Sequence, residues 1–272
     1  MKHIKQTSFE DTKRSRQKTY LSSGLIVMGV LLLAIALLIA GYLIYQYVDA
    51  QNRYRDLSTL AGLEVPVENS IVSKSFSLED ISIDWSALRG RNPDIVAWII
   101  IPGTRINYPI VKGYDNEYYL YRLFDDESND SGAIFVDFES SSNLNGENNF
   151  VYGHNMLDGS MFSDLLKFKK ESFLEENQTI FLATPARNFE LRAIATLRMA
   201  GNEPVRVFTF DTTDKFADFR DKLLSHAVAE VEDLEELRPD IRSLYSFITC
   251  EDYDNDYRIF LVAITVRSIE ME

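Results

Sequence analysis

The sequence predicts a mainly β domain of the α+β class, preceded by one N-terminal transmembrane helix. Short runs rich in β-branched and aromatic residues alternate with Gly, Pro, Asn and Asp along most of the chain. This pattern is typical of a closed barrel or a sandwich. Near the N-terminus, Leu21–Val48 contains no charged residue and exceeds the roughly 20 apolar residues that cross a bilayer.

The composition agrees with a globular protein that has an acidic surface. The chain has 272 residues, of which 46% are hydrophobic and 26% are charged, so wholesale disorder is excluded. Its formal net charge is −14. Because phosphate binding needs clustered Lys and Arg, we expect no nucleic acid among the partners.

The charges before the apolar segment predict its orientation. Six Lys and Arg residues precede it, against only Glu10 and Asp11, and such an excess usually stays in the cytoplasm. The alternative is a cleaved signal peptide, which has a shorter apolar region and a small-residue cleavage site that is not evident here. We therefore expect a cytoplasmic basic tail at 1–20, a signal anchor at 21–48 and an extracellular remainder.

Between the anchor and the domain, the sequence predicts a stalk and a linker. Asp49–Leu63 has mixed charges and indicates a helix, whereas Glu64–Asp80 has little periodicity and several Ser residues. The compact domain is expected to begin near Ile83 with a short helix. This assigns 49–82 to the stalk and linker and 83–272 to the domain.

After this short helix, the pattern predicts nine strands and three further helices within the domain. The last helix is predicted from the helical spacing of Phe216, Phe219 and Leu223. The expected helices are Asn116–Phe124, Ser163–Glu171 and Asp214–Val231. The expected strands are Ile95–Ile101, Ile106–Val111, Ala133–Asp137, Asn149–Tyr152, Gln178–Ala183, Phe189–Met199, Arg206–Asp211, Ser243–Cys250 and Tyr257–Val266.

Cys250 is the only cysteine, so an internal disulfide is excluded. A free thiol outside the cytoplasm is open to oxidation and needs a functional reason. The alternative is a buried cysteine that acts as a small apolar side chain. The chain has too few Cys and His residues for a structural zinc site, and no phosphate-binding Gly-rich loop precedes a helix. We expect no metal ion and no organic cofactor.

His154 and Arg258 are the side chains best placed to act with this thiol. His154 follows a predicted strand and Gly153 and precedes a turn-rich stretch, which indicates an imidazole at a rim. Arg258 opens the strand after Cys250, which is consistent with adjacent antiparallel strands. A nearby Arg lowers a thiol pKa from about 8.5. The alternatives are a hydrogen-bonded loop histidine and an arginine paired with a neighbouring Asp.

A series of short motifs extends from about Trp85 to Val266. They are Asn92-Pro-Asp-Ile-Val-Ala-Trp98, Ile101-Pro-Gly-Thr104, Tyr108-Pro-Ile-Val111, Gly113-Tyr-Asp-Asn116, Ser131-Gly-Ala-Ile-Phe-Val-Asp137, Tyr152-Gly-His-Asn-Met156, Asp158-Gly-Ser-Met-Phe162, Thr249-Cys250 and Arg258. In order and spacing, this series resembles the sortase family, specifically class B. Two departures lie beside Cys250. The family's Thr-Leu-x-Thr-Cys appears as Ser246-Phe-Ile-Thr-Cys250, and the connection to Arg258 is shorter than in many relatives.

The resemblance implies a mixed eight-stranded β-barrel with an N-terminal helix and a helix in the insertion before the last strands. It also implies an extracytoplasmic cysteine transpeptidase of Gram-positive-type bacteria, which cleaves a C-terminal sorting signal through a thioacyl-enzyme intermediate. Cys250 would be the nucleophile, His154 the general acid and base, and Arg258 the group that stabilises the oxyanion. The implied residues of the substrate groove are Asn116, Leu120, Thr249 and Glu251.

The implied partners are surface proteins with sorting signals, a peptidoglycan precursor or cross-bridge that supplies an amine, and the membrane. Three other functions stay open: a cysteine peptidase that uses water, a pilin-polymerising sortase, and a non-catalytic β domain that binds wall components. A binding domain leaves the combination of Cys250, His154 and Arg258 unexplained. Asn116 and Leu120 have alternative roles as a helix cap and a core residue. The sorting motif and the acceptor amine cannot be read from the sequence.

Overall fold

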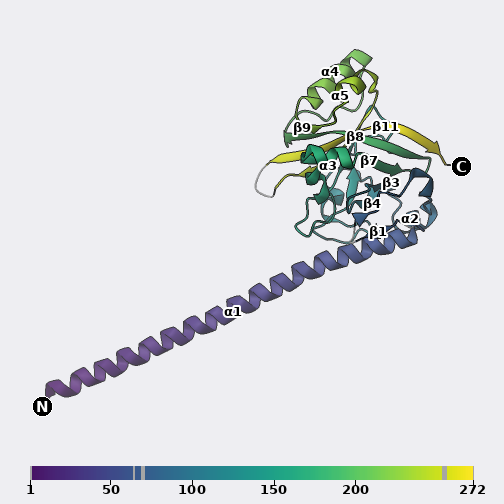
Figure 1. Cartoon of the computed structure of the whole chain (residues 1–272). Coiled ribbons are helices and arrows are strands. Elements are labelled where there is room, and N and C mark those ends of the chain that lie inside the picture. Colours follow the sequence, from purple (N-terminus) through teal and green to yellow (C-terminus); the bar gives the residue numbers. More distant parts are fainter. Residues whose placement is uncertain (1, 64, 69–70, 253–255, 272) are drawn as a thin grey trace. The chain divides into compact units, whose positions relative to one another are not determined.

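The computed structural model describes residues 2–63, 65–68, 71–252 and 256–271, with only the backbone described for 2–24 and 67–68 (Figure 1). The chain divides into two compact units, Met1–Val48 and Asp49–Glu272.

The first unit is formed by helix α1 (Lys2–Leu60), which continues into the second unit. From Leu25 to Tyr45 every residue is exposed. Among the described residues, Leu25–Leu60 is the one helical segment long and apolar enough to cross a membrane, and its most apolar window has a mean hydropathy of 2.8. The segment predicted as a span is therefore a helix of suitable length and composition.

The second unit is built on a closed barrel of eight strands, which confirms the predicted mixed barrel. The strands follow the order β11-β10-β6-β5-β4-β3-β7-β8, and β8 pairs again with β11. The pairs β4–β5 and β6–β10 are parallel and the others antiparallel. The barrel strands are β3 (Ile95–Ile100), β4 (Asn107–Val111), β5 (Ile134–Val136), β6 (Asn148–Tyr152), β7 (Thr179–Ala183), β8 (Arg187–Ala200), β10 (Leu244–Cys250) and β11 (Tyr257–Glu270).

The strands read as continuous apolar runs where both of their faces are covered. In β3, five of the six side chains are buried, including that of Trp98. Phe162 and Phe247 pack edge to face with ring centroids 6.3 Å apart, and both are fully buried. Burial of such aromatic side chains is worth a few kcal/mol each and supplies much of the core's stability.

Short helices decorate the barrel. In α2, the Asp84 carboxylate accepts a hydrogen bond from the Ala87 N–H and caps the helix, and Pro93 follows its end. The helical elements are η1 (Leu78–Asp80), α2 (Trp85–Arg91), η2 (Tyr118–Tyr121), η3 (Ser163–Lys169), α3 (Glu171–Glu176), α4 (Thr213–Leu224), α5 (Leu234–Leu237) and η4 (Arg238–Asp240). The remaining strands are β1 (Val67–Glu68), β2 (Ile71–Val72) and β9 (Ala227–Glu230).

The insertion between β8 and β10 differs from the prediction in two places. The expected strand Arg206–Asp211 is irregular, because side chains of the barrel satisfy its backbone: Asn148 donates to the Val207 carbonyl, and Glu147 accepts from the Phe210 N–H. The expected helix Asp214–Val231 ends at Leu224, and its last part is β9, which pairs with β8 (Figure 1). There the side chains alternate, with Ala229 buried between exposed neighbours, as a strand requires.

The compact unit begins at Asp49, earlier than the boundary near Ile83 expected from the sequence. In the segment predicted as a stalk, Tyr54 and Leu57 are buried, at 6% and 5% exposure. The Tyr54 hydroxyl donates to the Gly132 carbonyl at 2.8 Å, and its ring packs edge to face on Tyr108. Leu78 of the predicted linker is 1% exposed. The described residues of 49–82 therefore belong to the packed unit, because apolar side chains such as Tyr54, Leu57 and Leu78 are buried in it.

We expect this packing to be visible in thermal unfolding. Leu57→Ala in the fragment Asp49–Glu272 should destabilise the fold by about 2–5 kcal/mol, because truncating a buried leucine leaves a cavity. Leu60→Ala, three residues further on the same helix, is the matched control. Leu60 is 39% exposed, so its truncation should cost about 0.5 kcal/mol or less. Circular dichroism melts measure both, and equal midpoints for the two variants would mean that this segment is an independent stalk.

Candidate functional site

Three neighbouring strands bring Cys250, Arg258 and His154 to one end of the barrel. Cys250 ends β10, and its Cα partner on β11 is Arg258. On the other side, β6 runs parallel to β10 with Tyr152 opposite Ile248. The Gly153 N–H continues this ladder by donating to the Ile248 carbonyl at 3.0 Å. His154 and Cys250 each lie two residues beyond that last pair, so they reach the same level of adjacent strands.

Cys250 and Arg258 share one face of the sheet, because directly opposed residues in an antiparallel pair point the same way. The next pair on this face is Ile248 and Phe260. Phe260 contacts Phe150 of β6, with ring centroids 6.0 Å apart. Arg258 and Phe260, two residues apart on β11, therefore lie on the same face.

The His154 imidazole is oriented by a backbone carbonyl. Its Nε2 lies 2.6 Å from the Leu120 carbonyl oxygen, and its ring lies 5.8 Å from the Tyr121 ring, centroid to centroid. Because a carbonyl only accepts, Nε2 carries the proton and Nδ1 of the neutral ring is free to accept one. The preceding Gly153 is required by close packing, since a Cβ there would lie 2.4 Å from Ile134 Cδ1.

Cys250 is free and exposed, which removes the alternative of a buried structural cysteine. Arg258 is half-buried, and no carboxylate of the described residues forms an ion pair with it. Gly201 lies against both Asp256 and Arg258: a Cβ on Gly201 would be 2.4 Å from Asp256 Oδ1 and 3.2 Å from Arg258 Nε. Among the residues that the structure describes, the thiol and the guanidinium are therefore both available to a ligand.

The Glu251 carboxylate lies between two basic side chains and is largely shielded from solvent. It pairs with Lys169 at 2.5 Å and with Arg198 at 2.8 Å, and its side chain is 9% exposed. The hydrogen bond from Lys169, followed by that from Arg198, lowers the pKa of Glu251 despite partial burial. The Arg198 guanidinium also lies over the Tyr257 ring, 3.6 Å from its centroid. These contacts hold Glu251 and Tyr257, the residues that directly follow Cys250 and directly precede Arg258.

The other predicted groove residues have fixed surroundings as well. Thr249 is 2% exposed, and its hydroxyl has no hydrogen-bond partner among the described residues. Asn116 donates to the Asp137 carboxylate at 3.0 Å and accepts from the Phe138 N–H at 3.0 Å. Leu120 is half-buried on η2 and supplies the carbonyl that meets His154. Of the four predicted groove residues, Leu120 and Asn116 are half-buried, whereas Thr249 and Glu251 are buried.

Sequence reasoning gave Asp137 no role, although it placed this residue at the end of a strand and of one family motif. It is fully buried and accepts hydrogen bonds from Asn116, Tyr152 and Arg206. The one signal in the sequence is a carboxylate that directly follows the apolar run Ala-Ile-Phe-Val.

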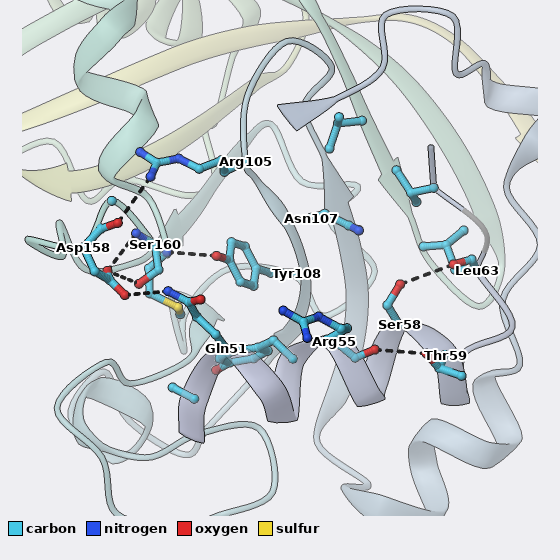
Figure 2. A pocket seen from close by; sticks show the side chains of 16 residues that line it. Gln51, Arg55, Ser58, Thr59, Leu63, Arg105, Asn107, Tyr108, Asp158 and Ser160 are labelled. Atoms are coloured by element: carbon cyan, nitrogen blue, oxygen red, sulfur yellow. Dashed lines mark hydrogen bonds between the residues drawn. The ribbon is translucent and has the colours of Figure 1, made fainter. Parts of the chain in front are cut away.

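A large pocket of the second unit lies away from Cys250, His154 and Arg258 (Figure 2). It has a volume of about 590 Å³ and lies between residues 50–63, β4 and the loop that follows His154. Gln51 donates to the Asp158 carboxylate of that loop at 2.9 Å. No cluster of His, Cys, Asp and Glu within the described ranges is arranged to hold a metal ion.

Comparison with known proteins identifies relatives over most of the chain. No family model matches. Sortase B of Listeria monocytogenes is 33% identical over 141 residues, which cover 52% of this chain and 57% of that protein. Sortase B of Staphylococcus aureus is 28% identical over 234 residues, which cover 85% of this chain and 94% of that protein.

Solved structures show the same fold. The crystal structure of Clostridium perfringens sortase B is 30% identical, with a TM-score of 0.62 over 67% of this chain and 99% of that chain. A Staphylococcus aureus sortase B–substrate complex is 25% identical, with a TM-score of 0.61 over 69% of this chain and 85% of that chain. The predicted family is confirmed: the chain belongs to the sortase family, class B, and is a sortase-type enzyme.

Proposed function

We propose that this chain is an extracytoplasmic cysteine transpeptidase that cleaves a C-terminal sorting signal and joins the released carbonyl to a cell-wall amine. The observation that supports it most is the position of Cys250, His154 and Arg258 at one end of three neighbouring strands. The sole thiol of the chain is exposed there, beside a cation and an oriented imidazole.

In the first half-reaction, the Cys250 thiolate attacks the scissile carbonyl of the sorting signal. The carbon–nitrogen bond breaks, and the leaving amine takes a proton from His154, which leaves a thioester on Cys250. In the second half-reaction, the acceptor amine attacks the thioester and gives its proton to His154. A new amide forms and the thiolate is released.

Arg258 has the chemistry to stabilise the oxyanion formed in both steps. Its guanidinium carries a fixed charge and several N–H donors on the same face as Cys250. Preorganised donors of this kind are worth a few kcal/mol in the transition state. The Leu120 carbonyl holds Nε2 of His154, so Nδ1 is the atom that exchanges the proton.

The proposed substrate groove contains Leu120, whose side chain is partly open. Asn116, Thr249 and Glu251 are proposed to shape the groove through the backbone that they hold. Substrates would be surface proteins with sorting signals, as the solved Staphylococcus aureus sortase B–substrate complex suggests by analogy. A crystal structure of a sortase B with a triglycine peptide suggests a peptide amine as the acceptor class. A peptidoglycan precursor or cross-bridge would provide such an amine.

We propose that α1 anchors the enzyme in the membrane of a Gram-positive-type bacterium. Leu25–Leu60 includes a segment apolar enough to span a membrane, and the basic residues of 1–20 favour a cytoplasmic N-terminus. The domain from Asp49 onward would then face the cell wall. No bound metal or organic cofactor enters the proposed reaction.

The reaction class is tested by product analysis with sorting-signal peptides. We expect mass spectrometry to find a thioester on Cys250, and amine capture to exceed hydrolysis when a glycine peptide or a wall-type amine is in excess. Release of only the free acid under saturating amine would make the enzyme a cysteine peptidase. A product that contains two protein segments joined to each other would instead indicate a pilin-polymerising sortase.

A further inference from the structure

The Asp137 carboxylate is the most heavily bonded buried charge beside the site. It is 0% exposed. Arg206 donates to both of its oxygens, at 2.8 and 2.9 Å. The Tyr152 hydroxyl donates at 2.9 Å, the Asn116 amide at 3.0 Å and the Glu139 N–H at 3.0 Å. Five hydrogen bonds thus converge on one side chain from separate parts of the chain.

Three of these donors lie on the segments that border the site. Asn116 precedes η2, whose Leu120 carbonyl holds His154. Tyr152 is the last residue of β6, two positions before His154. Arg206 lies in the irregular segment 201–212, which begins against Arg258.

The segment 201–212 covers the face of the barrel that bears Cys250 and Arg258. Phe208 packs on Phe150 with ring centroids 5.6 Å apart, and Phe150 in turn contacts Phe260 on this face. Because the segment has no regular secondary structure, a few side-chain contacts hold it in place. The bidentate pair of Arg206 with Asp137 is the strongest of these by geometry.

The charge state of Asp137 fits this role. Burial raises its pKa, but the hydrogen bonds from Arg206, the Glu139 backbone, Tyr152 and Asn116 more than offset this effect, so its pKa is lowered overall. Burial also raises the pKa of Tyr152, which keeps its phenol protonated as a donor. A buried carboxylate without its guanidinium partner is strongly unfavourable, so loss of Arg206 disturbs every group that Asp137 holds.

We propose that Asp137 is a positioning residue that aligns the peptide substrate with Cys250. Through Arg206 it holds the segment 201–212 over the reactive face, and through Asn116 and Tyr152 it holds the parts of the chain that carry Leu120 and His154. This inference rests on the proposed transpeptidase function. It assigns Asp137 no contact with the reacting atoms.

The test compares Arg206→Gln with Arg267→Gln in the full-length chain in detergent. Arg267 is the matched control, because it bridges the carboxylates of Glu79 and Glu190 just as Arg206 bridges those of Asp137 and Glu139, and it is similarly exposed. It lies nine residues beyond Arg258 on β11, roughly 30 Å along a strand. For Arg206→Gln we expect kcat/KM for a sorting-signal peptide to fall about 10- to 100-fold, as for a substrate misplaced by about 1 Å.

Alkylation of Cys250 by iodoacetamide separates positioning from reactivity. We expect its rate to stay within about twofold in Arg206→Gln, since a small reagent needs only an accessible thiol.

Arg206→Lys should recover part of the lost kcat/KM, because it keeps the charge but loses the fork. Asp137→Asn combined with Arg206→Gln should be little worse than either change alone if the two residues act as a unit.

Hydrogen exchange provides a readout that does not depend on peptide turnover. In Arg206→Gln we expect faster exchange both at 201–212 and at the Phe138 N–H, which bonds Asn116, and no change in Arg267→Gln. Equal kcat/KM and equal exchange for the two variants would overturn the inference, as would a parallel loss of alkylation. If the protein without any substitution processed no peptide, the proposed function would be refuted. The hydrogen-exchange result would still decide the role of Asp137.

Discussion

Cys250→Ala is expected to prevent formation of the acyl enzyme, and His154→Ala is expected to slow both half-reactions. Without Cys250 no thioacyl enzyme forms, because the chain has no second thiol. His154→Ala should fold normally and lose about 10²- to 10⁴-fold in kcat, since both proton transfers lose their carrier. Single-turnover mass spectrometry of the acyl enzyme and steady-state peptide cleavage measure the two effects separately.

The matched control for the imidazole is His226→Ala. His226 follows α4, and its Nδ1 contacts only the Lys222 carbonyl of the same turn among the described residues. Its loss should leave turnover unchanged. If His154→Ala retained full turnover, or if His226→Ala lost as much, the assigned proton carrier would be wrong.

Arg258→Lys is expected to lower kcat by about 10²- to 10³-fold, although the positive charge is kept. The lysine ammonium is a point charge, whereas the arginine fork has several donors in a fixed plane and can hold an oxyanion and a neighbouring backbone oxygen together. Peptide turnover measures the loss, and the iodoacetamide rate of Cys250 shows whether the thiol is still reactive.

Arg267→Lys on the same strand is the control for this change, because Arg267 pairs only with Glu79 and Glu190 within the described residues. It should leave kcat unchanged. If lysine at position 258 supported normal turnover, Arg258 would serve as a simple counter-charge, and its proposed role in holding the oxyanion would be refuted.

The barrel strands were predictable because their signals are local. β10 and β11 show apolar runs bounded by turn residues, as strands do. The pairing of Cys250 with Arg258 followed from two such strands joined by a short connection. The family prediction followed from the order of the motifs, and the comparisons confirm it.

The segment that begins the second unit has a buried apolar face, which the mixed charges of the same segment made hard to recognise in the sequence. Ala50, Tyr54, Leu57 and Ala61 are all buried and recur at the three- and four-residue spacing of one helix face. The mixed charges of the same segment suggested a solvated stalk. The partner surface decided the matter, because Tyr54 finds its acceptor at Gly132, far along the chain.

The sequence by itself determined the eight barrel strands, the apolar helix, the family, and the placement of Cys250 beside Arg258. The tertiary structure decided what depends on partners distant in the chain. Asp137 and Arg206 are 69 residues apart, and Lys169 and Glu251 are 82 residues apart. No local pattern predicts such pairs, since the sequence around one partner does not show where the other partner lies. Only the closed barrel brings them together, with Asp137 buried and its charge matched by Arg206.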